Sequence, residues 1–280
     1  MVKRSGNLKD QAENYYDDIS LTYSQNMENI MKSITDTVLK DVNLPVNPVC
    51  LDIACGTGIS TLMLAERCKG KATIYGIDLS EKMIEEANKT KKKQGLNNIS
   101  YHKMDAENLK FPGSTFDFVL SNMALYLFPD KRRALSEVYR VLKPGGGFAF
   151  TYVAGPHYKE EIDIFHTLAS RHPEIPSFFK SVEDSRTHFI SLEESVELFN
   201  SVGLSLSSIY GRHRLGWIEP DDLAGKNSQN VWWSLFRQNL LQDEIDLISQ
   251  EALEFVKPLL DSNDRLRITI YIIFANGKKP

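Results

Sequence analysis

The chain has 280 residues, of which 42% are hydrophobic and 25% charged, a composition typical of a globular protein with a substantial core. Its net charge of -4 and pI near 5.9 give no overall attraction to polyanions, so no nucleic-acid substrate or partner is expected. Three cysteines without a CxxC pair or a matching histidine spacing predict no metal site and a reducing, cytoplasmic location.

The first predicted element is a long helix over residues 8 to 41, where apolar residues recur at three- and four-residue steps. Pro45 and Pro48 end it. No apolar run typical of a secretion signal precedes it. We therefore divide the chain into an N-terminal helical cap at 1–44 and a main domain at 45–280.

Short β-rich runs follow, separated by amphipathic stretches. The predicted strands lie at 49–54, 72–78, 99–104, 116–121 and 146–153, and the helices between them at about 60–68, 81–94 and 131–142. Each helical stretch is long enough for a right-handed crossover between parallel strands. The alternation predicts an α/β fold with a parallel, doubly wound sheet.

After residue 154 the rhythm changes. A helix is predicted near 158–170, a second begins at a capping box formed by Ser191 and Glu194, and two further strands, LSLSSIYG and ITIYIIFAN, complete a seven-stranded Rossmann-like sheet. The second of these apolar runs is too short to cross a bilayer, so membrane insertion is not expected. Two segments, 155–190 and 219–262, look like helical insertions.

Large aromatic residues concentrate around the second insertion, namely Trp217, Trp232, Trp233 and Phe236. One interpretation is that the insertions form a lid over an apolar acceptor. The alternative is that these residues pack the insertion onto the sheet or form a homodimer contact.

The most informative run is VCLDIACGTGIS, in which a strand ends near Asp52 and turns through Ala54, Gly56 and Gly58 into a helix. Small residues at such a turn let a ligand approach the backbone closely. A dinucleotide fold starts in the same way, so an NAD-dependent oxidoreductase is an alternative. Thr61, however, replaces the third glycine of that fingerprint, and Asp52 is poorly matched to a pyrophosphate. The ammonium, carboxylate and sulfonium of S-adenosylmethionine (SAM) match an acid beside helix amides better.

Asp78 ends the next predicted strand, twenty residues beyond Gly58. A carboxylate there could accept hydrogen bonds from both ribose hydroxyls of an adenosine cofactor. The alternative is that Asp78 caps the helix that follows.

Four runs, LDIACGTG, IYGIDLS, KMDAENLKFPGSTFDFVLSNMALYLFPD and YRVLKPGGGFAFT, together resemble the ordered motifs of the class I SAM-dependent methyltransferases, especially the branch of the ubiquinone and menaquinone methyltransferases. The resemblance covers residues 14 to 153, and Ala54 departs from the commonest first glycine. It implies SAM as the cofactor, S-adenosylhomocysteine as its product, and a small-molecule acceptor.

The resemblance and the loop together give a set of expected cofactor contacts. They are Tyr16, Tyr23, Asp52, Ala54, Gly56, Thr57, Gly58, Asp78, Leu79, Met83, Asp105, Ala106, Ser121 and Asn122. By the resemblance, Asp105 accepts from the adenine amine, Met83 packs on the adenine edge, and the last two lie near the methionine part. Met83 could instead belong to the core, and Tyr16 and Tyr23, on the helix expected to fold over the cofactor, could simply be buried.

Methyl transfer from a sulfonium is an in-line displacement, so the protein mainly aligns the acceptor and excludes water. Where a hydroxyl is methylated, a base must also take its proton. His157, directly after the fifth strand, and Tyr126, where many relatives carry a histidine, are the candidate catalytic residues. We expect O-methylation, while C-methylation of a quinone-like ring and esterification of a carboxylate stay open. A noncatalytic SAM-binding module is a further alternative.

Overall fold

The computed structural model describes residues 8–40, 42–155, 159–178, 180, 189–220 and 240–280. Its elements, in chain order, are α1 (Leu8–Leu39), β1 (Val49–Ile53), α2 (Ile59–Arg67), β2 (Thr73–Asp78), α3 (Glu81–Gln94), β3 (Ile99–Lys103), β4 (Phe116–Asn122), the 3-10 helix η1 (Leu125–Leu127), α4 (Lys131–Val141), β5 (Leu142–Val153), α5 (Lys159–Arg171), α7 (Leu192–Ser201), β6 (Ser205–Ile218), α10 (Gln242–Val256), the 3-10 helix η2 (Lys257–Leu259) and β7 (Leu266–Lys278).

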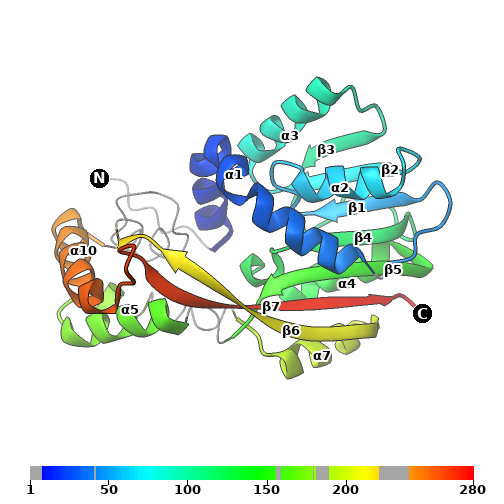
Figure 1. The fold of residues 1–280 in the computed structure, drawn as a ribbon. Helices are drawn as coiled ribbons and strands as arrows, with labels where there is room; N and C mark the ends of the chain where they lie inside the picture. The colour runs from blue at the N-terminus through cyan, green and yellow to red at the C-terminus, as the bar shows by residue number, and fades with distance from the viewer. Residues whose placement is uncertain (1–7, 41, 156–158, 179, 181–188, 221–239) are drawn as a thin grey trace. The chain divides into compact units, whose positions relative to one another are not determined.

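The strands form one seven-stranded sheet in the order β3-β2-β1-β4-β5-β7-β6 (Figure 1). The strands β1 to β5 pair in parallel, as predicted. No direction was predicted for the last two strands, and β7 runs antiparallel to β5: the amide of Gly145 donates to Lys279 O at one end and the amide of Ala154 donates to Tyr271 O at the other. The sheet is therefore mixed, because the strand and helix alternation that imposes parallel crossovers ends before β6.

Two strands are longer than predicted. β5 begins at Leu142 rather than at 146, and its register with β4 shifts between Phe116 and Phe118, a bulge that absorbs the glycine-rich start of the strand. β6 continues to Ile218, whereas the pattern predicted an end near 211. Both extensions contain glycines and polar residues, so a search for apolar runs did not predict them as strand.

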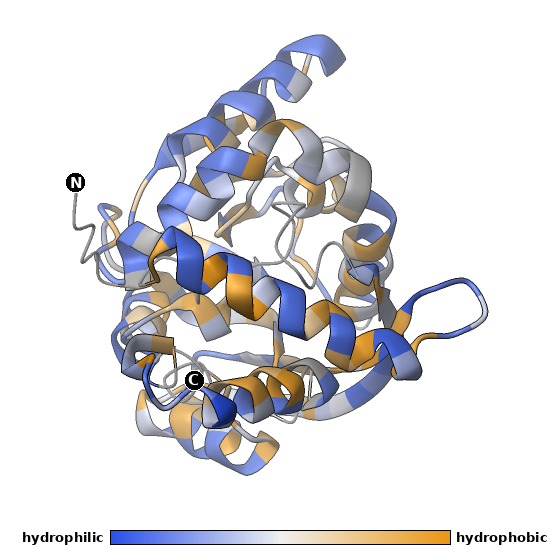
Figure 2. Cartoon of the chain, turned by 90° about the vertical axis from the view of Figure 1, so that its left-hand side faces the viewer, coloured by the Kyte–Doolittle hydropathy of each residue, from blue (hydrophilic) through white to orange (hydrophobic). Residues whose placement is uncertain are grey.

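Helices cover both faces of the sheet. In Figure 1, α1 and α2 cross in front of the strands and α4 lies behind them. The helices carry an apolar and a polar side, visible as orange and blue stripes in Figure 2. In α4 the buried residues recur at helical spacing and comprise Ala134, Leu135, Val138 and Val141. Burial of this stripe, together with the fully buried strand residues, forms the core.

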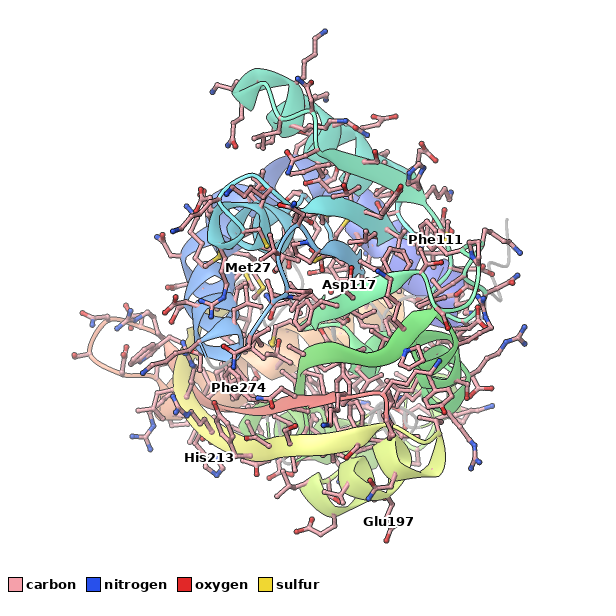
Figure 3. The ribbon with its side chains drawn as sticks, turned by 90° about the vertical axis from the view of Figure 1, so that its right-hand side faces the viewer. Met27, Phe111, Asp117, Glu197, His213 and Phe274 are labelled. Carbon is pink, nitrogen blue, oxygen red and sulfur yellow. The ribbon has the colours of Figure 1, made fainter. Side chains whose placement is uncertain are left out.

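The chain divides into two compact units, which we describe separately. The core unit comprises Ala12–Val153, Leu192–Gly211 and Ile273–Pro280, and the insert unit comprises Met1–Gln11, Ala154–Ser191 and Arg212–Ile272. In the core unit, aromatic residues fill the outer strands; the rings of Tyr210 and Phe274, the latter labelled in Figure 3, stack at 5.4 Å. In the insert unit α5 packs against α10. The lid role of the insertions stays a prediction.

Candidate active site

The turn after β1 has a backbone that few side chains tolerate. Ala54, Gly56 and Gly58 all have positive φ, of 55°, 54° and 88°. A Cβ added at Gly58 would clash with the phenol oxygen of Tyr101, whereas one added at Gly56 would meet only Tyr23 Cε1, at 4.0 Å. The turn is thus tightly packed at Gly58 and open at Gly56. The open position would let a ligand reach the backbone.

The same turn leads directly into α2. Gly58 is the N-cap residue of this helix and provides no side-chain hydrogen bond to its first turn. The first amides of a helix lack intrahelical acceptors, and the helix dipole favours negative charge there. This end of α2 can therefore receive a carboxylate.

Asp78, at the end of β2, is bound to the turn through its side chain. Its Oδ2 accepts from the Gly56 amide at 2.8 Å and its Oδ1 from the Ser80 amide at 2.9 Å. Burial raises the pKa of Asp78, and the bonds from backbone amides oppose that rise. A carboxylate offers about four acceptor positions, so capacity remains for hydroxyl donors. The N-cap of α3 is Ser80, whose Oγ accepts from the Met83 amide at 3.0 Å, so the alternative role of Asp78 as that cap is wrong.

Asp52 lies behind the turn rather than in it. Its side chain is fully buried, its Oδ2 accepts from Thr61 Oγ1 at 2.6 Å, and its Oδ1 has no hydrogen-bond partner. Burial raises the pKa of Asp52 to about 7, and the nearby Asp78 adds to the rise. Thr61, the residue that replaces the dinucleotide glycine, is thus occupied in holding this carboxyl group at the first turn of α2.

The two carboxyl groups of the site, on Asp52 and Asp78, have no ion-pair partner among the residues that the structure describes. Buried or half-buried acids without a cation are costly to ionise. A cationic ligand bound beside them would stabilise the ionised forms and offset that cost.

Three tyrosines lie beside the turn. Tyr16 and Tyr23, both on α1, approach edge to face with ring centroids 6.1 Å apart, and Tyr16 shares a hydrogen bond with Tyr126 of η1. We call these three residues the tyrosine cluster. Burial raises the pKa of each of the three phenols. They remain protonated at neutral pH, so Tyr126 is suited to donate a hydrogen bond, and its catalytic role stays a prediction.

Further contacts of α1 hold it across the starts of α2 and α3. Ser24 Oγ donates to Thr57 Oγ1 at 2.7 Å, and Ser80 Oγ donates to Asp17 Oδ1 at 2.5 Å. The Lys82 amide also donates to Asp17, at 3.3 Å. Sequence reasoning missed the anchoring roles of Ser24, on α1, and Ser80, the N-cap of α3, because a single serine carries no periodic signal.

The end of β4 brings together a buried polar network around Asn122. Its Nδ2 donates to Thr35 Oγ1 and to Ser60 Oγ, both at 2.9 Å, and its Oδ1 accepts from Thr151 Oγ1. The amide group is committed to these bonds, which join α1, α2, β4 and β5. The neighbouring Ser121 is fully buried, and its Oγ has no hydrogen-bond partner.

The remaining predicted contacts differ in exposure. Met83 is 1% exposed and faces the core, whereas Leu79, Asp105 and Ala106 are half-buried. The Met104 amide donates to Asp78 O at 2.9 Å, which places the following residues next to the end of β2. His157 lies outside the described residues, as do Trp232, Trp233 and Phe236.

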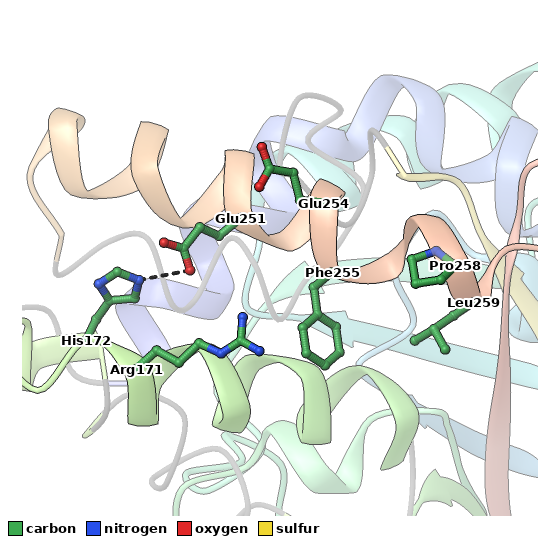
Figure 4. Close-up of a pocket in the computed structure, with 7 residues that line it drawn as sticks. All are labelled: Arg171, His172, Glu251, Glu254, Phe255, Pro258 and Leu259. Carbon is green, nitrogen blue, oxygen red and sulfur yellow. Dashed lines mark ion pairs between the residues drawn. The ribbon is translucent and has the colours of Figure 1, made fainter.

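A separate hollow of about 780 Å³ lies within the insert unit between α5 and α10 (Figure 4). It is lined by Arg171, His172, Glu251, Glu254, Phe255, Pro258 and Leu259. Within it His172 contacts Glu251 at 3.0 Å, and the Arg171 guanidinium lies over the Phe255 ring. Within the described ranges, no group of three or more His, Cys, Asp or Glu side chains is placed to hold a metal ion, and no helix is long and apolar enough to cross a membrane.

Comparisons with known proteins agree with this geometry. Residues 50–146 match the family of methyltransferase domains. The chain is 29% identical over 177 residues to demethylmenaquinone methyltransferase of Geobacillus stearothermophilus, covering 59% of this chain and 74% of that protein. It is 34% identical over 142 residues to the aklanonic acid methyltransferase DauC of Streptomyces sp. strain C5, covering 51% of this chain and 61% of that protein.

A solved structure shows the same fold. The crystal structure of a putative methyltransferase from Bacillus halodurans superposes with a TM-score of 0.62 at 18% identity, covering 89% of this chain and 99% of that one. Fold, ordered motifs and family match together define a class I SAM-dependent methyltransferase, with SAM as its cofactor. Several of the curated relatives that the chain matches are demethylmenaquinone methyltransferases. The alternatives of an oxidoreductase or a noncatalytic module receive no support from these matches.

Proposed function

We propose that SAM binds at the turn from Ala54 to Gly58 and that its methyl group passes to a small, partly apolar acceptor, at an oxygen that arrives ionised. The observation that carries the placement of the cofactor is that two acids, Asp52 and Asp78, lie around an open backbone turn without an ion-pair partner among the described residues. SAM is the ligand that brings two positive charges to such a site together with a carboxylate for the start of α2.

The proposed contacts follow from the hydrogen bonds at the turn. Asp78 would accept from the ribose hydroxyls while the Gly56 and Ser80 amides hold its carboxylate in place. The backbone at Gly56, which no side chain covers closely, would contact the methionine moiety of SAM. Leu79, Asp105 and Ala106, next to the end of β2, would border the adenine.

The tyrosine cluster supports an acceptor that needs no strong protein base. Phenols with raised pKa values are poor proton acceptors at neutral pH, yet they can donate to an acceptor oxygen and orient it. A carboxylate or an acidic phenol is already ionised and offers its lone pair directly. We therefore favour O-methylation of such a group over methylation of a neutral alcohol.

C-methylation of a quinone-like ring is the second candidate, because the matched relatives include demethylmenaquinone methyltransferases. An ionised hydroxyquinone carries nucleophilic character on both oxygen and ring carbon. The choice between them depends on which atom the pocket aligns with the sulfonium.

Turnover with a panel of acceptors tests the proposal. Hydroxyquinones, aromatic acids and aliphatic alcohols of similar size are incubated with the enzyme and SAM carrying a ¹³C-labelled methyl group, and S-adenosylhomocysteine release is measured. We expect release with the ionisable aromatic acceptors, and a product methyl carbon shift typical of attachment to oxygen. Methylation confined to ring carbon would establish the second candidate, and methylation of the alcohols alone would contradict the role given to the tyrosine cluster.

A further inference from the structure

Two of the three cysteines lie together at the end of β1 that is remote from the turn. Cys50 is the second residue of β1, and Cys68 is the C-cap residue of α2, the helix that returns along the strand. Their side chains share a hydrogen bond, and both thiols are free. The end of α2 thus lies beside the start of β1, with one thiol on each element.

The two thiols differ in accessibility. Cys50 is fully buried, whereas Cys68 is partly exposed. Arg67, next to Cys68, donates to the Lys40 and Val42 carbonyls at 3.2 and 3.0 Å, which keeps its positive charge beside the Cys68 thiol. A reagent can therefore reach Cys68 directly, while Cys50 can react only through Cys68.

We propose that Cys50 and Cys68 are a redox modification site that closes to an intramolecular disulfide on contact with a low-molecular-weight disulfide or a peroxide. With a small disulfide, the Cys68 thiolate attacks one sulfur and releases one small thiol, leaving a mixed disulfide. Cys50 then loses its proton and attacks the Cys68 sulfur, which releases the second small thiol. The two protein thiols are oxidised, the reagent disulfide is reduced to two thiols, and the two protein protons end on them.

A peroxide gives the same bridge with a different balance. Cys68 is oxidised to a sulfenic acid as the O–O bond breaks and one water forms. The attack of Cys50 on that sulfur then forms the S–S bond and releases a second water.

The disulfide would restrict the segment that carries the turn without blocking access to the turn. It would join the start of β1 to the end of α2 and enclose the whole turn from Ala54 to Gly58. A disulfide restricts the unfolded chain and so stabilises the fold, provided that the sulfurs can approach to about 2.05 Å. Cys55 lies at the opposite end of β1, where its thiol donates to Gly56 O at 3.7 Å, and takes no part.

The rate of closure has a predictable pH dependence. Burial raises the pKa of the Cys68 thiol, while Arg67 and Cys50 oppose that rise. The thiolate, which is the attacking species, is therefore a minority form at neutral pH. Below the thiol pKa the thiolate fraction rises about tenfold per pH unit, so closure should accelerate by roughly that factor.

Peptide mapping of the full chain tests the site. The reduced protein is treated with oxidised glutathione or hydrogen peroxide, the remaining thiols are alkylated in denaturant, and the peptides are identified by mass spectrometry. We expect a peptide bridged between Cys50 and Cys68, an alkylated Cys55, and a Tm raised by roughly 5 °C that a reductant restores.

Two variants separate the steps. C50A keeps the accessible thiol and loses the resolving one, so glutathione should stay attached to Cys68; C68A should leave Cys50 unmodified under the same treatment. A glutathione adduct that persists on Cys68 of the wild-type protein, or dimers joined through Cys68 instead of the internal bridge, would overturn the proposal. None of these readouts requires SAM binding, so the result is independent of the proposed function.

Discussion

The turn of the core unit and the α5–α10 region of the insert unit differ in how their charged side chains are partnered. Around the turn of the core unit, Asp52 and Asp78 have no cation beside them and their pKa values are raised. In the insert unit, His172 contacts Glu174 at 2.7 Å and Glu251 at 3.0 Å. Paired charges hold elements together, whereas a buried acid without a cation destabilises the fold. A cationic ligand that binds beside the acid offsets this cost. The contrast supports our proposal that the ligand site lies in the core unit.

The largest expected effect concerns the cost of the unpaired Asp52. Its folded pKa, about 7, lies above the ordinary value of 3.8, so the folded state binds the extra proton. The contribution of this proton to the free energy of unfolding is therefore complete below about pH 4 and is lost as the pH rises to about 7. We expect the D52N variant to lack this decrease in stability, which should amount to about 4 kcal/mol. Urea unfolding of the free protein at acidic and at slightly alkaline pH measures it.

Asp117, labelled in Figure 3, is a matched control for this experiment. Burial acts to raise its pKa, but bonds from Lys143, at 2.8 Å, and from the Val49 amide, at 2.9 Å, outweigh it and lower the pKa. D117N should therefore remove a contribution that is present above the ordinary value of 3.8 and lost in acid, the opposite sign. Equal pH dependence of D52N and the wild-type protein would show that Asp52 carries no such cost.

Next in size is the loss of the proposed ribose acceptor. D78A should weaken SAM binding about ten- to a hundredfold, because a charged acceptor of two hydrogen bonds contributes roughly 1.5–3 kcal/mol. Isothermal titration calorimetry measures the change, with D117N again as the control that keeps wild-type affinity. Unchanged affinity in D78A would remove Asp78 from the site.

A smaller effect is expected from the tyrosine cluster. Y126F removes the hydroxyl bonded to Tyr16 but keeps the ring, so the loss should be about 1 kcal/mol, or roughly fivefold in kcat/KM. SAM affinity should stay within about twofold of wild type, because we propose that Tyr126 contacts the acceptor and not SAM. An equal loss in both quantities would instead mean that the cluster only shapes the fold.

The smallest expected effect lies in the insert unit. Glu251 first, and then Glu174, raise the pKa of His172 above its ordinary value of 6.5. This stabilisation is fully present below about pH 6.5 and is lost as the pH rises through the higher folded value. Hydrogen exchange of α10 should therefore accelerate modestly from neutral to alkaline pH beyond the intrinsic rate, and H172Q should abolish that extra dependence. The same pH response in H172Q would assign it to another group.

The sequence predicted the arrangement of the core unit well because strands β1 to β5 are short apolar runs with glycine or helical punctuation between them. It also placed Gly56, Gly58 and Asp78 around one turn, since carboxyl ends of adjacent parallel strands must meet there. The sequence also predicted β7 as a strand but left its direction open, because periodicity carries no information on strand direction. Side-chain partners were left open as well: the bond from Thr61 to Asp52 and the commitment of Asn122 to Thr35, Ser60 and Thr151 depend on packing between distant segments.

A crystal structure of the protein soaked in SAM would test the central assignment most directly, because the two units offer alternative places for a ligand. We predict density along the turn at Gly56, with the ribose hydroxyls within hydrogen-bond distance of the Asp78 carboxylate. A vacant turn at saturating SAM, or density confined to the hollow between α5 and α10, would contradict it.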